Sequence, residues 1–124
     1  MSTIDRRAIN REYKETPRPA GIYRVRNTVT GKSLIGATMD LPSMLNRQRF
    51  QLESGGHPDR ELQQDWRELG SDAFEFGVLD ELELKNEPGY DPTDDLAALK
   101  QMWIEELTKT GEALYRQSLR ASRG

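Results

Sequence analysis

The sequence contains no cysteine and a single histidine, His57, among its 124 residues. The absence of cysteine excludes disulfide bonds, thiolate zinc sites and cysteine nucleophiles. One histidine excludes a multi-histidine metal centre. No apolar run reaches the roughly 20 residues that a membrane span needs, and the N-terminal stretch MSTIDRRAINREYKE lacks the apolar core of a signal peptide. We therefore expect a soluble, cytoplasmic protein with no membrane partner.

Aromatic residues are also scarce, at 7%, and hydrophobic residues of all kinds make up 35% of the chain. Such a chain fills one modest core, so we expect one domain at residues 20–109. Residues 1–19 are polar and end in Pro17-Arg-Pro19, and we predict that they form a basic N-terminal arm. Residues 110–124 hold few apolar side chains, and we predict that they form a polar C-terminal tail that frays.

The formal net charge is −3, but the charges are unevenly distributed. Residues 1–32 hold eight basic and three acidic side chains, and residues 109–124 hold four and one. Residues 33–108, in contrast, hold six basic and 17 acidic side chains. Two basic ends around an acidic middle favour a polyanion such as DNA or RNA as a partner for one face. The alternative is that charged ends keep a small domain in solution.

Alternating apolar and polar residues predict strands at 21–27 and 33–38, joined by a turn at Thr30-Gly31. Gly36 in the second strand would let another group approach its backbone closely. Residues 73–82 show the same alternation and predict a third strand.

Three segments have the spacing of apolar residues that is typical of amphipathic helices. The first runs from a cap at Asp40 to Gly55, and the second runs from Pro58 to Gly70. The third begins with Thr93 as its cap. The order is strand, strand, helix, helix, strand, helix. We therefore predict an α+β fold, a small three-stranded antiparallel sheet flanked by helices.

Short motifs across residues 20–107 resemble those of a known nuclease family. Gly21-Ile22-Tyr23, followed by Gly31-Lys32 and Leu34-Ile35-Gly36, resembles the paired GIY and YIG motifs of the GIY-YIG endonucleases. The likeness continues at Asp40-Leu41, Leu52, Gly56-His57-Pro58, Leu62-Gln63, Asp65-Trp66, Gly70 and Phe74-Glu75-Phe76. The predicted order of elements also matches this family, so the resemblance implies the nuclease-like fold.

The resemblance also implies a chemistry. Members of the family hydrolyse phosphodiester bonds in nucleic acid with one divalent metal, usually magnesium. A tyrosine activates or orients the attacking water, a helix arginine stabilises the charge on the phosphate, and a glutamate on the last helix holds the metal. A further tyrosine and often an asparagine support the site.

Most of these positions are substituted in this chain. Tyr23 matches the first tyrosine, and we expect it to contact a ligand or, if cleavage persists, to act in catalysis. By the resemblance, Leu34 stands at the position of the second tyrosine, Met44 at that of the arginine and Lys100 at that of the glutamate. Gln48 stands where a histidine often follows the arginine by four residues, and Arg116 corresponds loosely to the asparagine. We therefore expect no metal cofactor, with Mg²⁺ required only if the domain still cleaves.

Lys100 lies inside the apolar stripe of the last predicted helix, about 40° around the helix from Leu96. It is either a rim lysine whose ammonium group reaches solvent or a lysine that faces the position of the family's metal. A lysine there repels magnesium and attracts a phosphate or carboxylate. We predict that Lys32 and Arg116 bind the same anionic ligand.

Three residues have two interpretations each, and His57 has one. Tyr23 either packs against the sheet or is a remnant of the site, and Met44 is either core or a site position. Arg47 is either a solvated surface residue or a replacement for the missing arginine. His57 is interpreted as a solvated loop residue that makes no metal site alone.

Three functions remain open. The first is a nuclease-family pseudoenzyme that binds nucleic acid or another anion through Lys100, Arg116 and the basic arm. The second is an active metal-dependent DNA endonuclease that uses Tyr23 with a displaced Arg47. The third is a protein-interaction or regulatory domain with a protein partner, which a sequence pI near 5.3 favours over general DNA binding.

Overall fold

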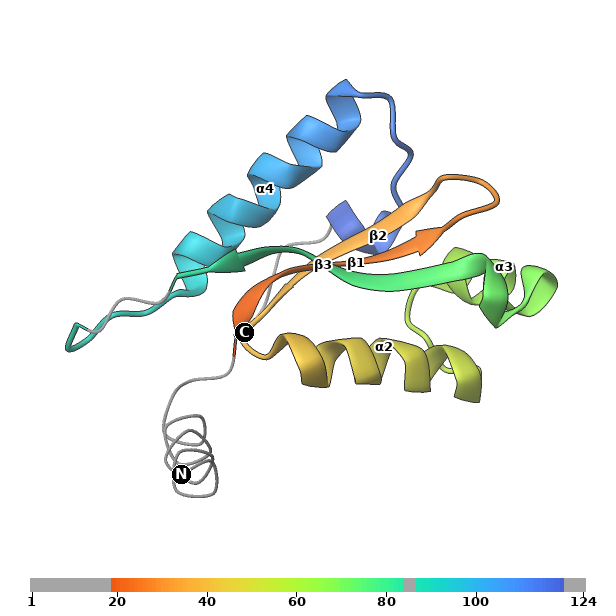
Figure 1. The fold of residues 1–124 in the computed structure, drawn as a ribbon, viewed down its shortest axis with the longest axis horizontal. Coiled ribbons are helices and arrows are strands. Elements are labelled where there is room, and N and C mark those ends of the chain that lie inside the picture. The colour runs from red at the N-terminus through yellow and green to blue at the C-terminus, as the bar shows by residue number, and fades with distance from the viewer. Residues whose placement is uncertain (1–18, 84–86, 120–124) are drawn as a thin grey trace, which may run out of the picture.

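The computed structural model describes residues 19–83 and 87–119, and the predicted arm lies almost wholly outside them. Within the described residues the elements are β1 (Ala20–Asn27), β2 (Ser33–Thr38), α2 (Leu41–Ser54), α3 (Arg60–Leu69), η1 (Ser71–Ala73), β3 (Phe74–Leu82), α4 (Thr93–Lys109) and η2 (Arg116–Leu119). The predicted α+β class and the order of strands and long helices are confirmed (Figure 1).

The three strands form an antiparallel sheet in the order β2-β1-β3, so the GIY segment occupies the central strand. The β1–β2 turn is closed by Asn27, whose Oδ1 accepts hydrogen bonds from the backbone N–H groups of Val29 and Thr30 at 3.0 and 3.2 Å. Gly31 adopts a φ of 80° there, which a glycine adopts without strain.

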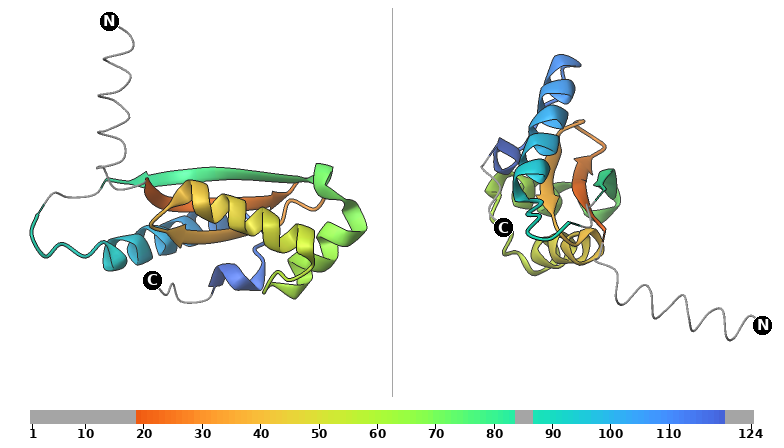
Figure 2. Two further views of the ribbon diagram at one scale, coloured as in Figure 1. Left: turned by 90° about the horizontal axis from the view of Figure 1, so that it is seen from below. Right: turned by 90° about the vertical axis from the view of Figure 1, so that its left-hand side faces the viewer.

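Helices cover both faces of the sheet. Figure 1 shows α4 on one face and α2 on the other, and Figure 2 shows α2 in front of the sheet with α4 behind it. Successive residues of β1 point to opposite faces, so Ile22 packs toward α4 with Ile35 and Ile104. The other core cluster holds Tyr23, Val25, Leu34, Leu41, Leu52, Leu62, Trp66, Phe74 and Tyr115.

Side chains and glycines fix the helix ends. Asp40 Oδ1 accepts from Ser43 N at 3.2 Å, and Gly55 closes α2 in the left-handed conformation, as predicted. The second helix begins later than predicted, because Asp59 rather than Pro58 precedes its first residue and caps it. The predicted cap Thr93 is also wrong. Thr93 is the first residue of α4, and its N–H and hydroxyl donate to Asp91 Oδ1 at 3.0 and 2.7 Å.

The predicted fraying of residues 110–124 is wrong for residues 113–119. Ser33 N donates to Ala113 O at 3.0 Å, and Tyr115 N donates to Ser33 O at 2.8 Å, so this segment pairs with the edge of β2. The Tyr115 side chain is completely buried in the core. Residues 120–124 lie outside the described residues. Across the described part of the chain, no helix combines the length and apolar character needed to cross a membrane.

Candidate functional site

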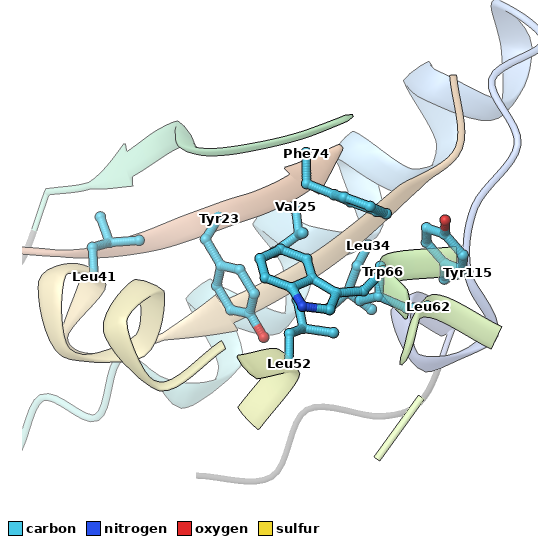
Figure 3. Close-up of a cluster of buried hydrophobic side chains, with 9 residues drawn as sticks. All are labelled: Tyr23, Val25, Leu34, Leu41, Leu52, Leu62, Trp66, Phe74 and Tyr115. Carbon is cyan, nitrogen blue, oxygen red and sulfur yellow. The ribbon is translucent and has the colours of Figure 1, made fainter. Parts of the chain in front are cut away.

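Tyr23 on β1 carries the hydroxyl around which the candidate site is built. The residue is 7% exposed and lies with Val25 in the core cluster on the α2 side (Figure 3). Its ring crosses its cross-strand partner Gly36, where an added Cβ atom would lie 2.3 Å from Tyr23 Oη. The close approach predicted for Gly36 is therefore made by the tyrosine ring itself.

Residues of α2 surround the Tyr23 hydroxyl. Gln48 Nε2 donates to Tyr23 Oη at 3.4 Å and lies 3.5 Å from the Met44 sulfur. Met44 is half-buried and packs against the core cluster, whereas Arg47 is exposed. The structure thus brings together Tyr23, Met44, Arg47 and Gln48, which the sequence assigned to site positions.

His57 also belongs to this group, and the interpretation of a solvated loop residue is wrong. The side chain is 5% exposed, and its Nε2 lies 2.6 Å from Gln48 Oε1. Its Nδ1 accepts from the backbone N–H of Asp59 at 2.9 Å. His57 lies in a polar stretch of sequence, so nothing local predicted its burial between α2 and α3.

Burial changes the titration of both ring systems. It raises the pKa of Tyr23 to about 12, although the positive charge of Arg47 opposes the shift. Burial also lowers the pKa of His57 below its ordinary value, and the nearby Asp59 opposes that shift. At neutral pH the site therefore presents a neutral phenol and a neutral imidazole.

Lys100 is buried on α4, on the layer across the sheet from α2 (Figure 1). It is 7% exposed and lies one turn from the buried Leu96 and Ile104, so its stem packs within the apolar stripe of α4, as the helical spacing predicts. Burial lowers the pKa of its ammonium group. The charge that influences the pKa of Tyr23 is that of Arg47. That Lys100 faces the family's metal position stays a prediction.

Lys32 and Arg116 lie in a second polar region, away from the hydroxyl of Tyr23. Lys32 forms an ion pair with Glu61, and its Nζ lies 5.1 Å from the centre of the Tyr115 ring. Arg116 is exposed and lines an open groove with Pro58, Asp59, Arg60, Glu61 and Gln117. The positive charge of Lys32 is thus shared with a carboxylate, whereas Arg116 faces solvent.

Tyr115 organises this second region, and the sequence analysis did not single it out. Its hydroxyl donates to Asp65 Oδ2 at 2.6 Å and accepts from Asn27 Nδ2 at 3.1 Å. Burial and the hydrogen bond to Asp65 raise its pKa. The segment after α4 was expected to be polar and frayed, and that expectation hid the role of this residue.

The residues present do not fit a magnesium site of the kind that the resemblance implies. Magnesium prefers carboxylate oxygens, but Lys100, which the resemblance assigns to the position of the metal-holding glutamate, offers none. Leu34, at the position of the second tyrosine, is buried in the core and has no hydroxyl. Within residues 19–83 and 87–119, no three His, Asp or Glu side chains gather in a way that could hold a metal ion.

Sequence comparison gives one curated relative of known activity. The chain is 28% identical over 88 residues to the intron-associated endonuclease 1 of Enterobacteria phage T4. The match includes 71% of this chain, which therefore spans about a third (33%) of the length of that relative. No protein-family model matches the chain.

Two solved structures, both of the catalytic domain of intron endonuclease I-TevI, share the fold. A mutant form of that domain matches with a TM-score of 0.65 and 25% identity, over 85% of this chain and 97% of the other. A second structure matches with a TM-score of 0.59 and 28% identity, over 76% of this chain and 94% of the other. The described domain thus corresponds to nearly the whole of that catalytic domain.

Proposed function

Because the chain belongs to the GIY-YIG endonuclease family, we propose that it is a nuclease-type domain that has lost or weakened phosphodiester cleavage and binds nucleic acid. The substitutions at the catalytic positions support this proposal most directly. By the resemblance, a leucine replaces the second tyrosine, a methionine replaces the arginine that offsets phosphate charge, and a lysine replaces the glutamate that holds the metal. Tyr23 remains, and burial holds its pKa at about 12.

Nucleic-acid binding is the function that the remaining groups support best. Arg47 is exposed and close enough to Tyr23 for its charge to influence the tyrosine pKa, and Arg116 is exposed beside the beginning of α3. By the resemblance, Lys100 replaces a residue that is negatively charged in a hydrolytic relative, although it is buried on α4, across the sheet from Arg47. Arginine donates to phosphate oxygens through a planar pair of N–H groups. The basic side chains of residues 1–18 add charge to the same interaction.

Salt dependence tests the binding. Fluorescein-labelled duplex DNA, single-stranded DNA and duplex RNA are titrated with the full chain, and anisotropy is followed at increasing NaCl. If three phosphates are neutralised, affinity falls about 40-fold between roughly 50 and 200 mM salt, because counterions are released. Absence of binding at low salt, or binding that salt leaves unchanged, contradicts the proposal and favours the protein-interaction alternative.

Arg47 and Arg49 provide a matched pair of variants on α2. Arg47→Gln removes the charge beside Tyr23, so we expect weaker binding and a salt slope smaller by about one. Arg49→Gln is the control, because Arg49 stacks on Phe76 at 4.5 Å and lies 3.9 Å from Glu53, away from the hydroxyl. Equal effects of the two variants would point to general charge attraction rather than to this site.

A second candidate, an active endonuclease with displaced catalytic residues, is favoured by one observation. Arg47 lies close enough to Tyr23 to influence its pKa, so it could replace the missing helix arginine. Supercoiled plasmid is incubated with the chain and Mg²⁺ or Mn²⁺. This candidate requires nicking that both Tyr23→Phe and Arg47→Gln abolish. A preparation that nicks no substrate with either metal removes this candidate.

A further inference from the structure

Four buried residues form a continuous path of hydrogen bonds from the beginning of α3 to the Tyr23 hydroxyl. The backbone N–H of Asp59 donates to His57 Nδ1 at 2.9 Å, and His57 Nε2 lies 2.6 Å from Gln48 Oε1. Gln48 Nε2 then lies 3.4 Å from Tyr23 Oη. All four residues are buried, so water competes little for these hydrogen bonds.

The direction of the first two bonds follows from the backbone end of the path. A backbone N–H can only donate, so Nδ1 of His57 carries a lone pair. In a neutral imidazole the proton then lies on Nε2. Burial lowers the pKa of His57 and keeps the ring neutral near pH 7. The Nε2–H group therefore donates to Gln48 Oε1.

This bond fixes the orientation of the Gln48 amide. With Oε1 directed to His57, the NH₂ group faces Tyr23 Oη and the Met44 sulfur. Gln63 holds the loop in place, because its Oε1 accepts from His57 N at 3.0 Å and its Nε2 donates to Leu52 O at 2.9 Å. The Tyr23 oxygen thus accepts a hydrogen bond from the protein, and its own proton points elsewhere.

We propose that Gln48 and His57 are positioning residues that fix the Tyr23 hydroxyl as a hydrogen-bond donor, so that Tyr23 binds a phosphate oxygen and does not accept a proton from water. The identity of the ligand rests on the proposed function, whereas the direction of the hydrogen bonds does not. An O–H donor to a charged phosphate oxygen forms a short and strong hydrogen bond.

A Tyr23 hydroxyl that donates a hydrogen bond differs from the water-activating tyrosine that the resemblance implies. To act as a base, the phenol must first lose its proton, and burial holds its pKa at about 12. The acceptor side of the oxygen is also occupied by Gln48. A ligand can then meet only the O–H donor of Tyr23. This donor suits the binding of a phosphodiester without its hydrolysis.

The tautomer of His57 is the first test. His57 is the only histidine of the sequence, so its two ring nitrogens are identified without ambiguity in long-range ¹H–¹⁵N NMR spectra of the tag-free full chain at pH 7. We expect the proton on Nε2 and an unprotonated Nδ1. A proton on Nδ1 would reverse the Gln48 amide and overturn the inference, whether or not any nucleic acid binds.

A double-mutant cycle tests the positioning role. Gln48→Met has nearly the same length but lacks the N–H donor. We expect it to lower affinity for fluorescein-labelled DNA about threefold, and Tyr23→Phe to lower it about tenfold. In the Tyr23→Phe background the Gln48→Met effect should vanish, because Gln48 acts through the hydroxyl. Gln51→Met on the same helix is the control and should leave the affinity unchanged.

The outcomes separate the two proposals. Equal losses from Gln48→Met in both backgrounds show a merely structural role and overturn the inference. If Gln48→Met does not fold, the tautomer of the wild-type chain still decides the direction of the hydrogen bonds. Absence of DNA and RNA binding by every form, with the proton on Nε2, overturns the proposed function and its phosphate ligand, while the donor assignment stands.

Discussion

At the scale of single residues, the packing of the Tyr23 ring against Gly36 restricts which residue β2 can hold at position 36. The tyrosine ring fills the volume that a side chain at Gly36 would occupy, with Cζ 2.4 Å from the place of an added Cβ atom. Real Cβ contacts are never this short, so any larger residue must displace the ring. Gly36 is therefore part of the site, although it bears no functional group.

We expect Gly36→Ala to destabilise the fold by about 1–3 kcal/mol, because overpacking forces the ring from its place. Urea unfolding monitored by circular dichroism measures the loss. Gly77→Ala in β3 is the matched control, since an added Cβ there meets no atom within 4 Å. Equal stabilities of the two variants would show that the Tyr23 ring moves at no cost.

His57 gives the stability a specific pH dependence. Its folded pKa is lowered below 6.5 by burial, so the unfolded chain binds the proton first as pH falls. The contribution of neutral His57 to the free energy of unfolding is complete above pH 6.5. It is lost as pH falls through the folded pKa, at up to about 1.4 kcal/mol per pH unit. We expect His57→Gln to flatten the urea-derived stability profile between about pH 7 and 5. An unchanged profile would contradict this.

At the scale of elements, the segment after α4 completes the sheet edge. Ser118 Oγ accepts from the backbone N–H of Ile35 at 2.8 Å, and Tyr115 pairs with Ser33 through its backbone. These bonds cover part of β2, an edge strand that would otherwise present unpaired N–H groups. The C-terminal segment is thus structural, and its polar composition reflects these hydrogen bonds.

We expect Ser118→Ala to cost about 1–3 kcal/mol, because it leaves the buried N–H of Ile35 without an acceptor. Amide hydrogen exchange at Ile35 should become faster, and urea unfolding should occur at lower concentration. The control is Ser54→Ala, since Ser54 is exposed and its hydroxyl donates to Gln51 O at the end of α2. Unchanged exchange at Ile35 would mean that the segment does not protect the edge.

At the scale of the whole molecule, the sheet separates the residues that the resemblance assigns to one site. Tyr23, Leu34 and Met44 lie on the α2 face, whereas Lys100 is carried by α4 on the other face. We therefore predict that no single substitution among these positions restores cleavage.

The triple variant Leu34→Tyr, Met44→Arg, Lys100→Glu restores the family residues at all three positions. We expect the triple variant to nick supercoiled plasmid in a magnesium-dependent way and faster than the unchanged chain, at a stability cost of about 1–3 kcal/mol from the larger side chain at position 34. Adding Tyr23→Phe should abolish the gain. A folded triple variant that stays inert would show that the correspondence of positions is wrong.

Local patterns in the sequence were sufficient to predict the strands and the helices. Alternation in residues 21–27 and 33–38, the cap at Asp40 and the glycine at Gly55 each depend on neighbours in the chain, and the structure confirms them. The fold class follows from their order. The cap predicted at Thr93 failed because Thr93 is already the first helical residue, and its hydroxyl donates to Asp91 Oδ1 instead of accepting from an N–H group of the first turn.

The sequence by itself determined the strands, the helices and the close approach at Gly36, whereas the replacement of an acidic residue at Lys100 stays a prediction. The tertiary structure decided which polar residues are buried together. Gln48 of α2 meets His57 of the loop that follows this helix, and Tyr115 reaches Asn27 from 88 positions away. Such contacts depend on the packing of whole layers, which no local pattern of polar residues encodes.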